Sequence, residues 1–137
     1  MNIEKYIGLP FVRGGRTLRK DRGLDCYGLA KLFYENEYNI ILPEYEGIDT
    51  KQDDFAYCSE SIMSLSTYKD FIQVDNPELG DLLLFNVMGL PVHIGIYVDR
   101  GLMLHTFDKS NSAIENYTRL KWKNKLYGVY RHKKQMV

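Results

Sequence analysis

The chain has 137 residues, of which 45% are hydrophobic and 26% are charged. This length fits one domain, because domains cluster near ~100–150 residues. Eighteen basic residues balance eighteen acidic ones, so the zero net charge gives no support to nucleic-acid binding. The high aromatic content and low net charge are opposite to the composition of a disordered chain. We therefore predict a single folded domain over residues 1–137.

The chain carries no recognisable targeting segment. It begins with polar residues, and no apolar stretch with a small-residue cleavage site follows. The longest apolar runs, such as residues 82–85, are far shorter than the ~20 residues that span a bilayer. We therefore expect synthesis in the cytoplasm without a signal peptide, and no membrane partner. If the protein works outside a cytoplasm, another component has to deliver it.

The first part of the chain is expected to be helical, with one long loop. A short helix is expected over residues 3–9. A loop rich in Gly, Arg and Lys follows over residues 11–22, with Gly14, Gly15 and Gly23 as flexible points. The clearest helix then begins after Asp25, whose carboxylate can cap the first turn. Its apolar stripe begins at Cys26 and repeats at helical spacing as far as Phe33.

The rest of the chain turns from helix to strand. A weaker helix is expected over residues 53–65, with Cys58 as a core residue. Strands are expected over residues 82–85, 92–98, 102–107 and 127–131, and residues 99–101 suit a three-residue hairpin. His132, beside two lysines, is expected in a solvated tail. Helices followed by antiparallel strands predict an α+β fold.

Cys26 is the first candidate for chemistry, because it opens the clearest helix. The helix dipole at that end favours thiolate over thiol, and the backbone N–H groups there offer an oxyanion site. A small buried hydrophobe is the other interpretation of the same position, since Cys is among the most buried residue types.

His93 and His105 are candidates because two adjacent predicted strands carry them. With a three-residue hairpin, Val98 faces Leu102 and His105 faces Gly95, so the two histidines share a face as diagonal neighbours. Gly95 then leaves room for the second ring. On this geometry His93 could act as a base and His105 could orient it through the other ring nitrogen. Two independently satisfied histidines remain the alternative.

Five blocks of sequence, in order, resemble one known family. Residues 25–29 (DCYGL) resemble the nucleophile motif of NlpC-type papain-like cysteine peptidases, which cut peptidoglycan stem peptides. Residues 8–15, 80–85 and 92–97 are similar to the family's segment before the nucleophile, its strand before the histidine and its histidine strand, and residues 104–106 form the fifth block. Arg16, residues 104–106 and residues 128–131 look most like the branch associated with phage and prophage tails. Together the blocks cover most of the chain.

The resemblance implies a fold, a reaction and roles for named residues. The fold is α+β and papain-like, with the nucleophile helix packed on a C-terminal antiparallel sheet. Cys26 is implied as the nucleophile, His93 as the general base and then acid, and His105 as the third, polar residue. The implied reaction is hydrolysis through an acyl-enzyme, commonly between D-glutamate and a diamino acid of the stem peptide. No cofactor and no metal are implied.

Three further residues are candidates for substrate binding. Relatives can use the acid before the nucleophile to hold a substrate amine, which makes Asp25 a candidate as well as an N-cap. Phe11 stands where many relatives have Tyr, which bears on the choice of substrate. Arg13 belongs to the basic loop, which could meet an anionic wall polymer or be a solvated surface.

We expect a stem-peptide substrate, and phage tail proteins are expected partners that would carry the enzyme to the bacterial wall. Three other functions stay open at this stage. A catalytically silent tail or wall-binding module could keep the same fold. A metal-dependent hydrolase could use Cys26, His93 and His105 as ligands. A thiol enzyme could transfer an acyl group or deamidate a side chain instead of hydrolysing a peptide.

Overall fold

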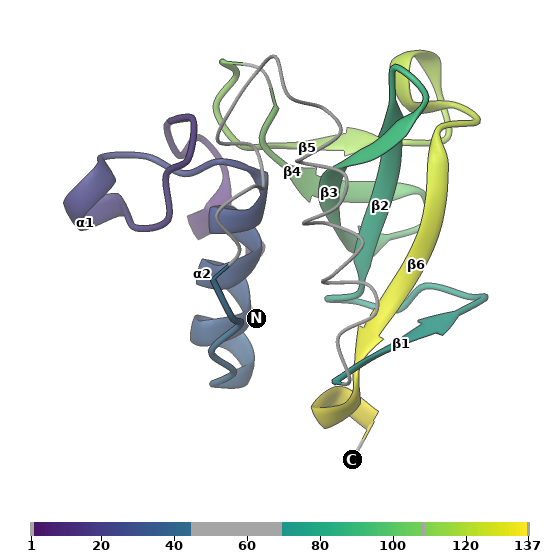
Figure 1. Cartoon of the computed structure of the whole chain (residues 1–137), viewed down its shortest axis with the longest axis horizontal. Helices are drawn as coiled ribbons and strands as arrows, with labels where there is room; N and C mark the ends of the chain where they lie inside the picture. Colours follow the sequence, from purple (N-terminus) through teal and green to yellow (C-terminus); the bar gives the residue numbers. More distant parts are fainter. Residues whose placement is uncertain (1, 45–69, 108, 137) are drawn as a thin grey trace.

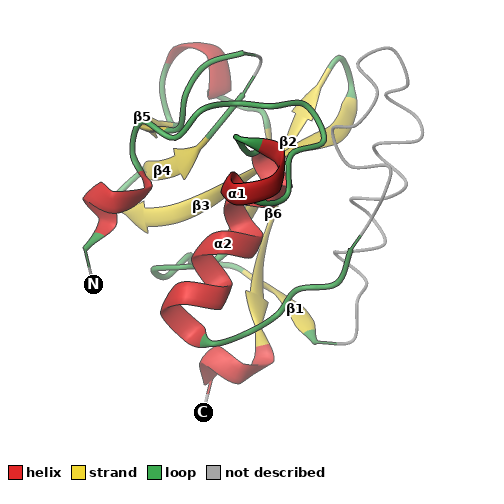
Figure 2. Cartoon of the chain, turned by 90° about the vertical axis from the view of Figure 1, so that its left-hand side faces the viewer, coloured by secondary structure: helices red, strands yellow, loops and turns green. Residues whose placement is uncertain are grey.

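The computed structural model describes residues 2–44, 70–107 and 109–136. Its main helix lies on one side of an antiparallel sheet, which confirms the predicted α+β class (Figures 1 and 2). Before the sheet come the 3-10 helix η1 (Ile3–Tyr6), the one-turn helix α1 (Leu18–Asp21) and the main helix α2 (Cys26–Tyr38). The helix predicted over residues 53–65, with Cys58, lies outside the described residues.

Six strands form the sheet, in the spatial order β1-β6-β2-β3-β4-β5. Every neighbouring pair in that order is antiparallel. Their bounds are β1 (Phe71–Val74), β2 (Leu82–Val87), β3 (Leu90–Asp99), β4 (Leu102–His105), β5 (Ala113–Asn116) and β6 (Leu126–His132). Two short 3-10 helices, η2 (Leu120–Trp122) and η3 (Lys133–Met136), stand before and after β6.

Local signals at both ends define α2. The Asp25 side chain accepts the backbone N–H of Gly28 at the N-cap, and Asn39 ends the helix in the left-handed conformation at φ 56°. Leu29 and Phe33, from the predicted stripe, are fully buried. Burying side chains of this size contributes about 1.5–3 kcal/mol each, so the stripe holds α2 on the sheet. Among the strands, β3 makes the main contact with α2.

The β2–β3 and β3–β4 hairpins differ in detail from the predicted strands and turn. Strands β2 and β3 are longer than predicted, because Met88 and Gly89 both take positive φ and make a tight two-residue turn. In the next hairpin Leu102 pairs with Asp99, so the predicted pairing with Val98 is wrong. An irregularity between Tyr97 and Asp99 absorbs the extra residue and restores the predicted pairing further along the strands.

Strands β1 and β5 were not predicted, and β1 changes the position of His132. Strand β6 extends through His132, which pairs with Phe71 of β1. The His132 ring is buried and lies 5.0 Å from the Phe71 ring in an edge-on arrangement. The prediction that His132 belongs to a solvated tail is therefore wrong, because the edge strand β1 covers it.

Buried side chains form two cores on opposite sides of the central strands. Leu82 and Leu84 join α2 in the first core, whereas Leu83 and Phe85 join Trp122 in the second. This division follows from the alternation of side chains along a strand. Strand β3 therefore lies between the two cores.

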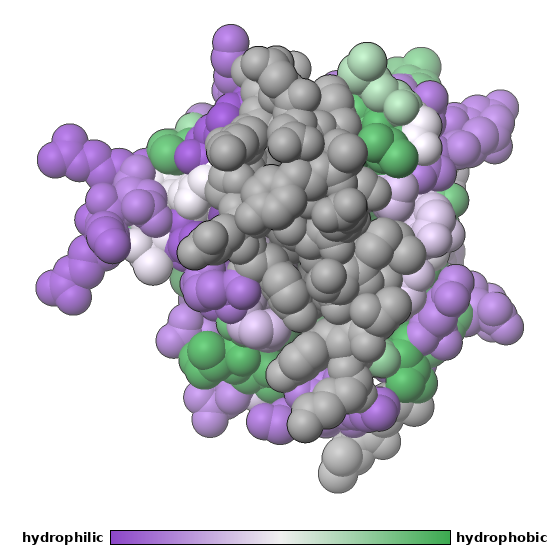
Figure 3. Space-filling view, in the orientation of Figure 1, coloured by the Kyte–Doolittle hydropathy of each residue, from purple (hydrophilic) through white to green (hydrophobic). Residues whose placement is uncertain are grey.

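Hydrophilic and hydrophobic residues are unevenly distributed on the face that Figure 3 shows. Figure 3 shows hydrophilic side chains projecting from the margins of this face, with hydrophobic residues in small groups between them. Within the described ranges, no helix has both the length and the apolar character needed to cross a membrane.

Candidate active site

Cys26 lies at the start of α2, as the sequence predicts. It is the first helical residue, its side chain is buried, and it forms no disulfide with any residue that the structure describes. The Asp25 Oδ1 atom accepts the Gly28 N–H at 2.7 Å and fixes the geometry of the first turn. The partial positive charge of the helix N-terminus favours a thiolate at this position.

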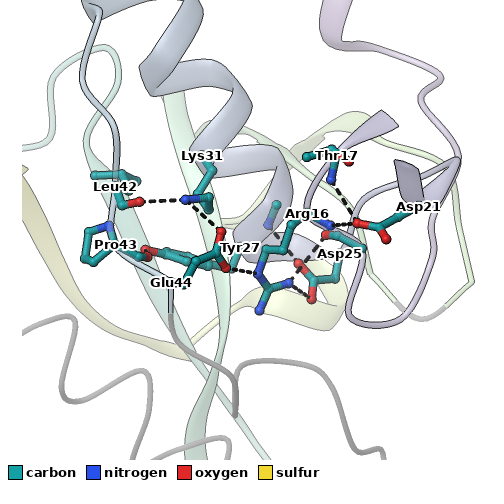
Figure 4. Close-up of polar contacts among 11 residues, drawn as sticks. Arg16, Thr17, Asp21, Asp25, Tyr27, Lys31, Leu42, Pro43 and Glu44 are labelled. Atoms are coloured by element: carbon teal, nitrogen blue, oxygen red, sulfur yellow. Dashed lines mark hydrogen bonds and ion pairs between the residues drawn. The ribbon is translucent and has the colours of Figure 1, made fainter. Parts of the chain in front are cut away.

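An arginine from the preceding loop holds Asp25 from outside the helix (Figure 4). The Arg16 guanidinium pairs with the Asp25 carboxylate, which is fully buried, and lies over the Tyr27 ring. Burial lowers the pKa of Arg16, but the charges of Asp25 and Cys26 outweigh burial, so the net shift is upward. Arg16 therefore stays charged, and its field favours the thiolate of Cys26. The use of Asp25 to hold a substrate amine stays a prediction.

Glycines bring the loop into direct contact with the first turn of α2. A Cβ added at Gly28 would lie 2.2 Å from the carbonyl oxygen of Gly15, and one at Gly15 would lie 2.2 Å from that of Gly23. The prediction that Gly15 and Gly23 are flexible points is wrong, because both are buried where backbones approach closely. These contacts fix the position of the loop relative to Cys26.

Phe11 and Arg13, the other predicted substrate-binding residues, lie at the start of the same loop. Phe11 forms an isolated parallel bridge with Leu24, two residues before Cys26. The Arg13 guanidinium lies 6.0 Å from the centroid of the Phe11 ring, and both side chains are half-buried. Their segment thus runs beside the residues that lead into α2. A contact of either side chain with a substrate stays a prediction.

The predicted meeting of the two histidines is confirmed. The Nε2 atom of His93 on β3 lies 2.8 Å from the Nδ1 atom of His105 on β4, and both side chains are buried. The space above Gly95 is filled differently from the prediction. A Cβ there would lie 2.6 Å from the sulfur of Met103, so Met103 and not His105 takes that room.

Aromatic rings of the second core hold the histidine pair in place. The Trp122 ring stacks on His93, with centroids 4.7 Å apart and planes 20° from parallel. Phe107 meets His93 edge-on at 4.8 Å, and Phe85 lies 6.1 Å from it. These contacts fix the plane of the imidazole and keep water from most of its surface.

Burial controls the charge of both histidines. The pKa of His93 is held well below its usual value, first by burial and then by the charges of His105 and Lys121. Burial also lowers the pKa of His105, although its contact with Glu115 acts in the opposite direction. Both rings are therefore neutral near pH 7, which is the form a general base needs before it accepts a proton.

The sequence analysis missed two residues that contact the pair. Glu115 on β5 places Oε1 2.8 Å from the Nε2 atom of His105, and the indole N–H of Trp122 donates to the same oxygen at 3.1 Å. A polar residue two positions along an edge strand carries little signal in one sequence. Glu115 could have been found only by predicting strand β5 and its pairing with β4, the strand that carries His105.

The geometry brings His93 and His105 together and places Cys26 on the neighbouring element. Cys26 belongs to the same core as Val92 and Ile94, the two residues that flank His93 in the sequence. The pairing of the Cys26 sulfur with His93 stays a prediction. Across the described ranges, no three His, Cys, Asp or Glu side chains gather in a way that could hold a metal ion.

A helix that opens on a cysteine, packed on an antiparallel sheet that carries a histidine pair, is the arrangement of a papain-like thiol hydrolase. A model of the NlpC/P60 family matches residues 8–131. The chain belongs to this family, whose members are cysteine peptidases that hydrolyse peptidoglycan.

Similar proteins include both a curated sequence and solved structures. The chain is 27% identical over 131 residues to the gamma-DL-glutamyl hydrolase of Bacillus subtilis strain 168, which covers 93% of this chain and 27% of that protein. It therefore spans about a quarter of the length of the curated relative.

Two solved structures of the family share the fold. A lipoprotein-like NLP/P60 protein from Staphylococcus aureus Mu50 matches with a TM-score of 0.61 and 25% identity, covering 93% of this chain and 38% of that one. An NlpC/P60 protein from Bacillus cereus ATCC 10987 matches with a TM-score of 0.65 and 21% identity, covering 94% and 37%. The papain-like α+β fold predicted from the sequence is confirmed.

Proposed function

We propose that the chain is a cysteine endopeptidase that hydrolyses amide bonds in peptidoglycan stem peptides. Cys26 is the nucleophile, His93 the general base and acid, and His105 the residue that orients His93. The observation that carries this proposal is the buried His93–His105 pair, in a chain that belongs to the NlpC/P60 family. Asp25, Phe11 and Arg13 are proposed to line the approach of the substrate.

The reaction follows from the groups at the site. His93 Nδ1 takes the proton from the Cys26 thiol, and the thiolate attacks the amide carbonyl carbon. The first backbone N–H groups of α2 stabilise the oxyanion that forms. His93 then gives its proton to the leaving amine, which leaves an acyl-enzyme. Water, deprotonated by His93, attacks the thioester, releases the acid and returns the thiol to Cys26.

We propose the bond between D-glutamate and the diamino acid as the one that is cleaved. In the stem peptide this bond joins the side-chain carboxyl of D-glutamate to an amine. The name of the Bacillus subtilis relative, a gamma-DL-glutamyl hydrolase, supports a preference for γ-glutamyl bonds.

Mass spectrometry of purified peptidoglycan, before and after digestion, tests this function. The wild-type chain should release fragments with a free γ-carboxyl on D-glutamate and a free amine on the diamino acid. Cys26→Ala should release none, and the exposed-surface variant Glu35→Gln should match wild type.

Each rival function gives a different result in the same assay. Transferred acyl groups or a gain of one mass unit without chain cleavage would indicate acyl transfer or deamidation. Loss of activity with a chelator, together with zinc in elemental analysis, would indicate a metal enzyme. A folded chain that leaves every muropeptide unchanged would indicate a silent binding module.

We also propose that a phage or prophage tail carries this enzyme to the bacterial cell wall. The likeness of Arg16 and of residues 104–106 and 128–131 to the tail-associated branch supports this proposal. Proteomics of purified tail particles from an induced host would detect the chain as a stoichiometric component. Its absence from intact tails, with the chain abundant in the lysate, would contradict the proposal.

A further inference from the structure

Glu115 closes a ring of contacts around the histidine pair. One oxygen of its carboxylate, Oε1, lies 2.8 Å from His105 Nε2 and 3.1 Å from the indole nitrogen of Trp122. The Trp122 ring in turn stacks on His93, and His93 bonds His105. Four side chains are therefore joined in a closed cycle, with Glu115 as its charged member.

The topology of the sheet explains how Glu115 reaches this position. Strand β5 pairs with β4, with Ala113 opposite His105 and Glu115 opposite Met103. Glu115 and His105 are thus diagonal neighbours on one face, within reach of long side chains. The Glu115 side chain is 41% exposed, whereas that of His105 is 7% exposed. The carboxylate links the buried pair to the edge of the sheet.

The positions of the hydrogens follow from the partners. A carboxylate can only accept hydrogen bonds, so His105 must carry its hydrogen on Nε2. A neutral His105 then has a bare Nδ1, which can only accept the hydrogen on His93 Nε2. A neutral His93 with its hydrogen on Nε2 has a lone pair on Nδ1. The opposite tautomer of His105 would place the lone pair of Nε2 against Glu115.

We propose that Glu115 is a positioning residue that sets the tautomers of His105 and, through it, of His93. This proposal rests on the proposed function, because it assigns the Nδ1 atom of His93 to the proton of the Cys26 thiol. When Nδ1 accepts that proton, the imidazolium keeps its Nε2–H bond to His105. No proton moves to Glu115, whose charge stabilises the imidazolium through the intervening ring.

The charged groups near His93 and His105 act on the two rings in opposite directions. Lys121, from the 3-10 helix η2 beside Trp122, acts against a positive charge on both histidines. Its amino group lies 4.3 Å from the Phe107 ring centroid and 5.4 Å from that of Trp122. Among the described residues that influence the pKa of His105, only Glu115 favours the charged ring, through its hydrogen bond and its charge.

Nitrogen-15 NMR of the imidazole rings tests the proposal without any need for activity. The background is Cys26→Ala, which removes the nucleophile and keeps the pair. We expect both His93 and His105 to carry hydrogen on Nε2 at pH 7. Glu115→Leu should move His105 toward a mixture with the Nδ1–H form and shift the His93 resonances. Glu115→Gln should retain the Nε2–H forms, because its amide oxygen still accepts from His105.

Kinetics of the same variants separate positioning from simple stability. Outer hydrogen-bond partners of functional histidines typically contribute ~10–100-fold, so Glu115→Leu should lower kcat by about that factor with little change in KM. Glu115→Gln should lose less, and its activity should extend to lower pH, because removing the charge lowers the pKa of His105 further. Glu35→Gln, a charge-neutralising change on the exposed face of α2, should leave the profile unshifted.

Two results would overturn the proposal. One is an unchanged set of His93 and His105 nitrogen resonances in Glu115→Leu. If the leucine variant does not fold, an unchanged pH dependence of the His105 resonances in Glu115→Gln would overturn the proposal in its place. The other is an equal loss of kcat in Glu115→Gln and Glu115→Leu with no movement of the pH profile. If the tautomers change in Glu115→Leu but the wild-type chain cleaves no muropeptide, the role of Glu115 stands and only the proposed function is rejected.

Discussion

Gly28→Ala should impair catalysis, although this position lies two residues beyond the nucleophile. In a helix interior this change ordinarily stabilises by about 0.5–1 kcal/mol. Here the new Cβ would lie 2.2 Å from the carbonyl oxygen of Gly15, against an ordinary contact of 3.4 Å or more. The helix start and the loop must therefore separate by roughly 1 Å. That oxygen also accepts the Asp25 N–H at 3.1 Å, so the separation disturbs the residue before Cys26.

The size of the effect follows from the displacement. A misplacement of about 1 Å can cost ~10²-fold in rate, and overpacking costs about 1–3 kcal/mol, which exceeds the gain in helix propensity. We expect kcat/KM on a defined muropeptide to fall about 100-fold. Stability measured by urea unfolding should fall by about 1–2 kcal/mol.

Glu35→Ala, an exposed change on the same helix, is the matched control and should stay close to wild type in both measurements. A Gly28→Ala variant with the stability of wild type and kcat/KM within twofold of it would refute the reasoning, because the loop would then yield without consequence.

Three other changes test separate parts of the site. His105→Ala should lower kcat by about 10–100-fold, because an orienting group is partly dispensable, whereas His93→Ala should abolish turnover. Equal losses of kcat in the two variants, measured in steady-state assays, would contradict these roles. Asp25→Ala should destabilise the fold by about 3 kcal/mol in urea unfolding, because it removes both the helix cap and the buried partner of Arg16. A loss of stability below about 1 kcal/mol would contradict the structural role of Asp25. The folded-state pKa of His93 lies below its unfolded value, so the unfolded chain binds more protons as the pH falls. The contribution of this group to the free energy of unfolding should therefore be fully present above pH ~6.5 and decline below it, by about 1.4 kcal/mol per pH unit. Urea unfolding at pH 7, 6 and 5 should show a smaller decline of stability with falling pH in His93→Phe than in wild type. An equal decline in both proteins would count against a neutral buried ring.

Local chemistry made the nucleophile helix predictable. The cap at Asp25, the apolar stripe beginning at Cys26 and the fading of the helix near Asn39 are all encoded within a few residues of one another. The loop before the helix was not predictable in the same way. Its glycines looked like flexible points, but Gly15 and Gly23 meet backbone from segments that only the fold brings together.

Strand alternation predicted the histidine pair even though one pairing was wrong. A bulge shifts Leu102 from Val98 to Asp99, yet the irregularity between Tyr97 and Asp99 restores the register before His105. The side chains therefore kept the predicted face. The alternation of side chains along two paired strands was enough to predict that the two histidines share a face. The exact turn, and the side chain that packs over Gly95, depended on tertiary packing.

The partners of the pair could not be found from the sequence. Glu115 lies on a four-residue edge strand with no strong alternation, and Trp122 lies in a 3-10 helix of three residues. Both reach the site through long-range pairing and stacking. His132 was misplaced for the same reason, since only the unpredicted strand β1 buries it.

The central claim is that the His93 imidazole activates Cys26 by accepting the proton of its thiol. The most direct measurement is the rate at which iodoacetamide alkylates Cys26 from pH 4 to 9, followed by mass spectrometry of the Cys26 peptide. We predict fast alkylation near neutral pH in the wild-type chain, and slow alkylation that follows an ordinary thiol pKa of ~8.5 in His93→Ala. The same ordinary thiol profile in both proteins would contradict the claim.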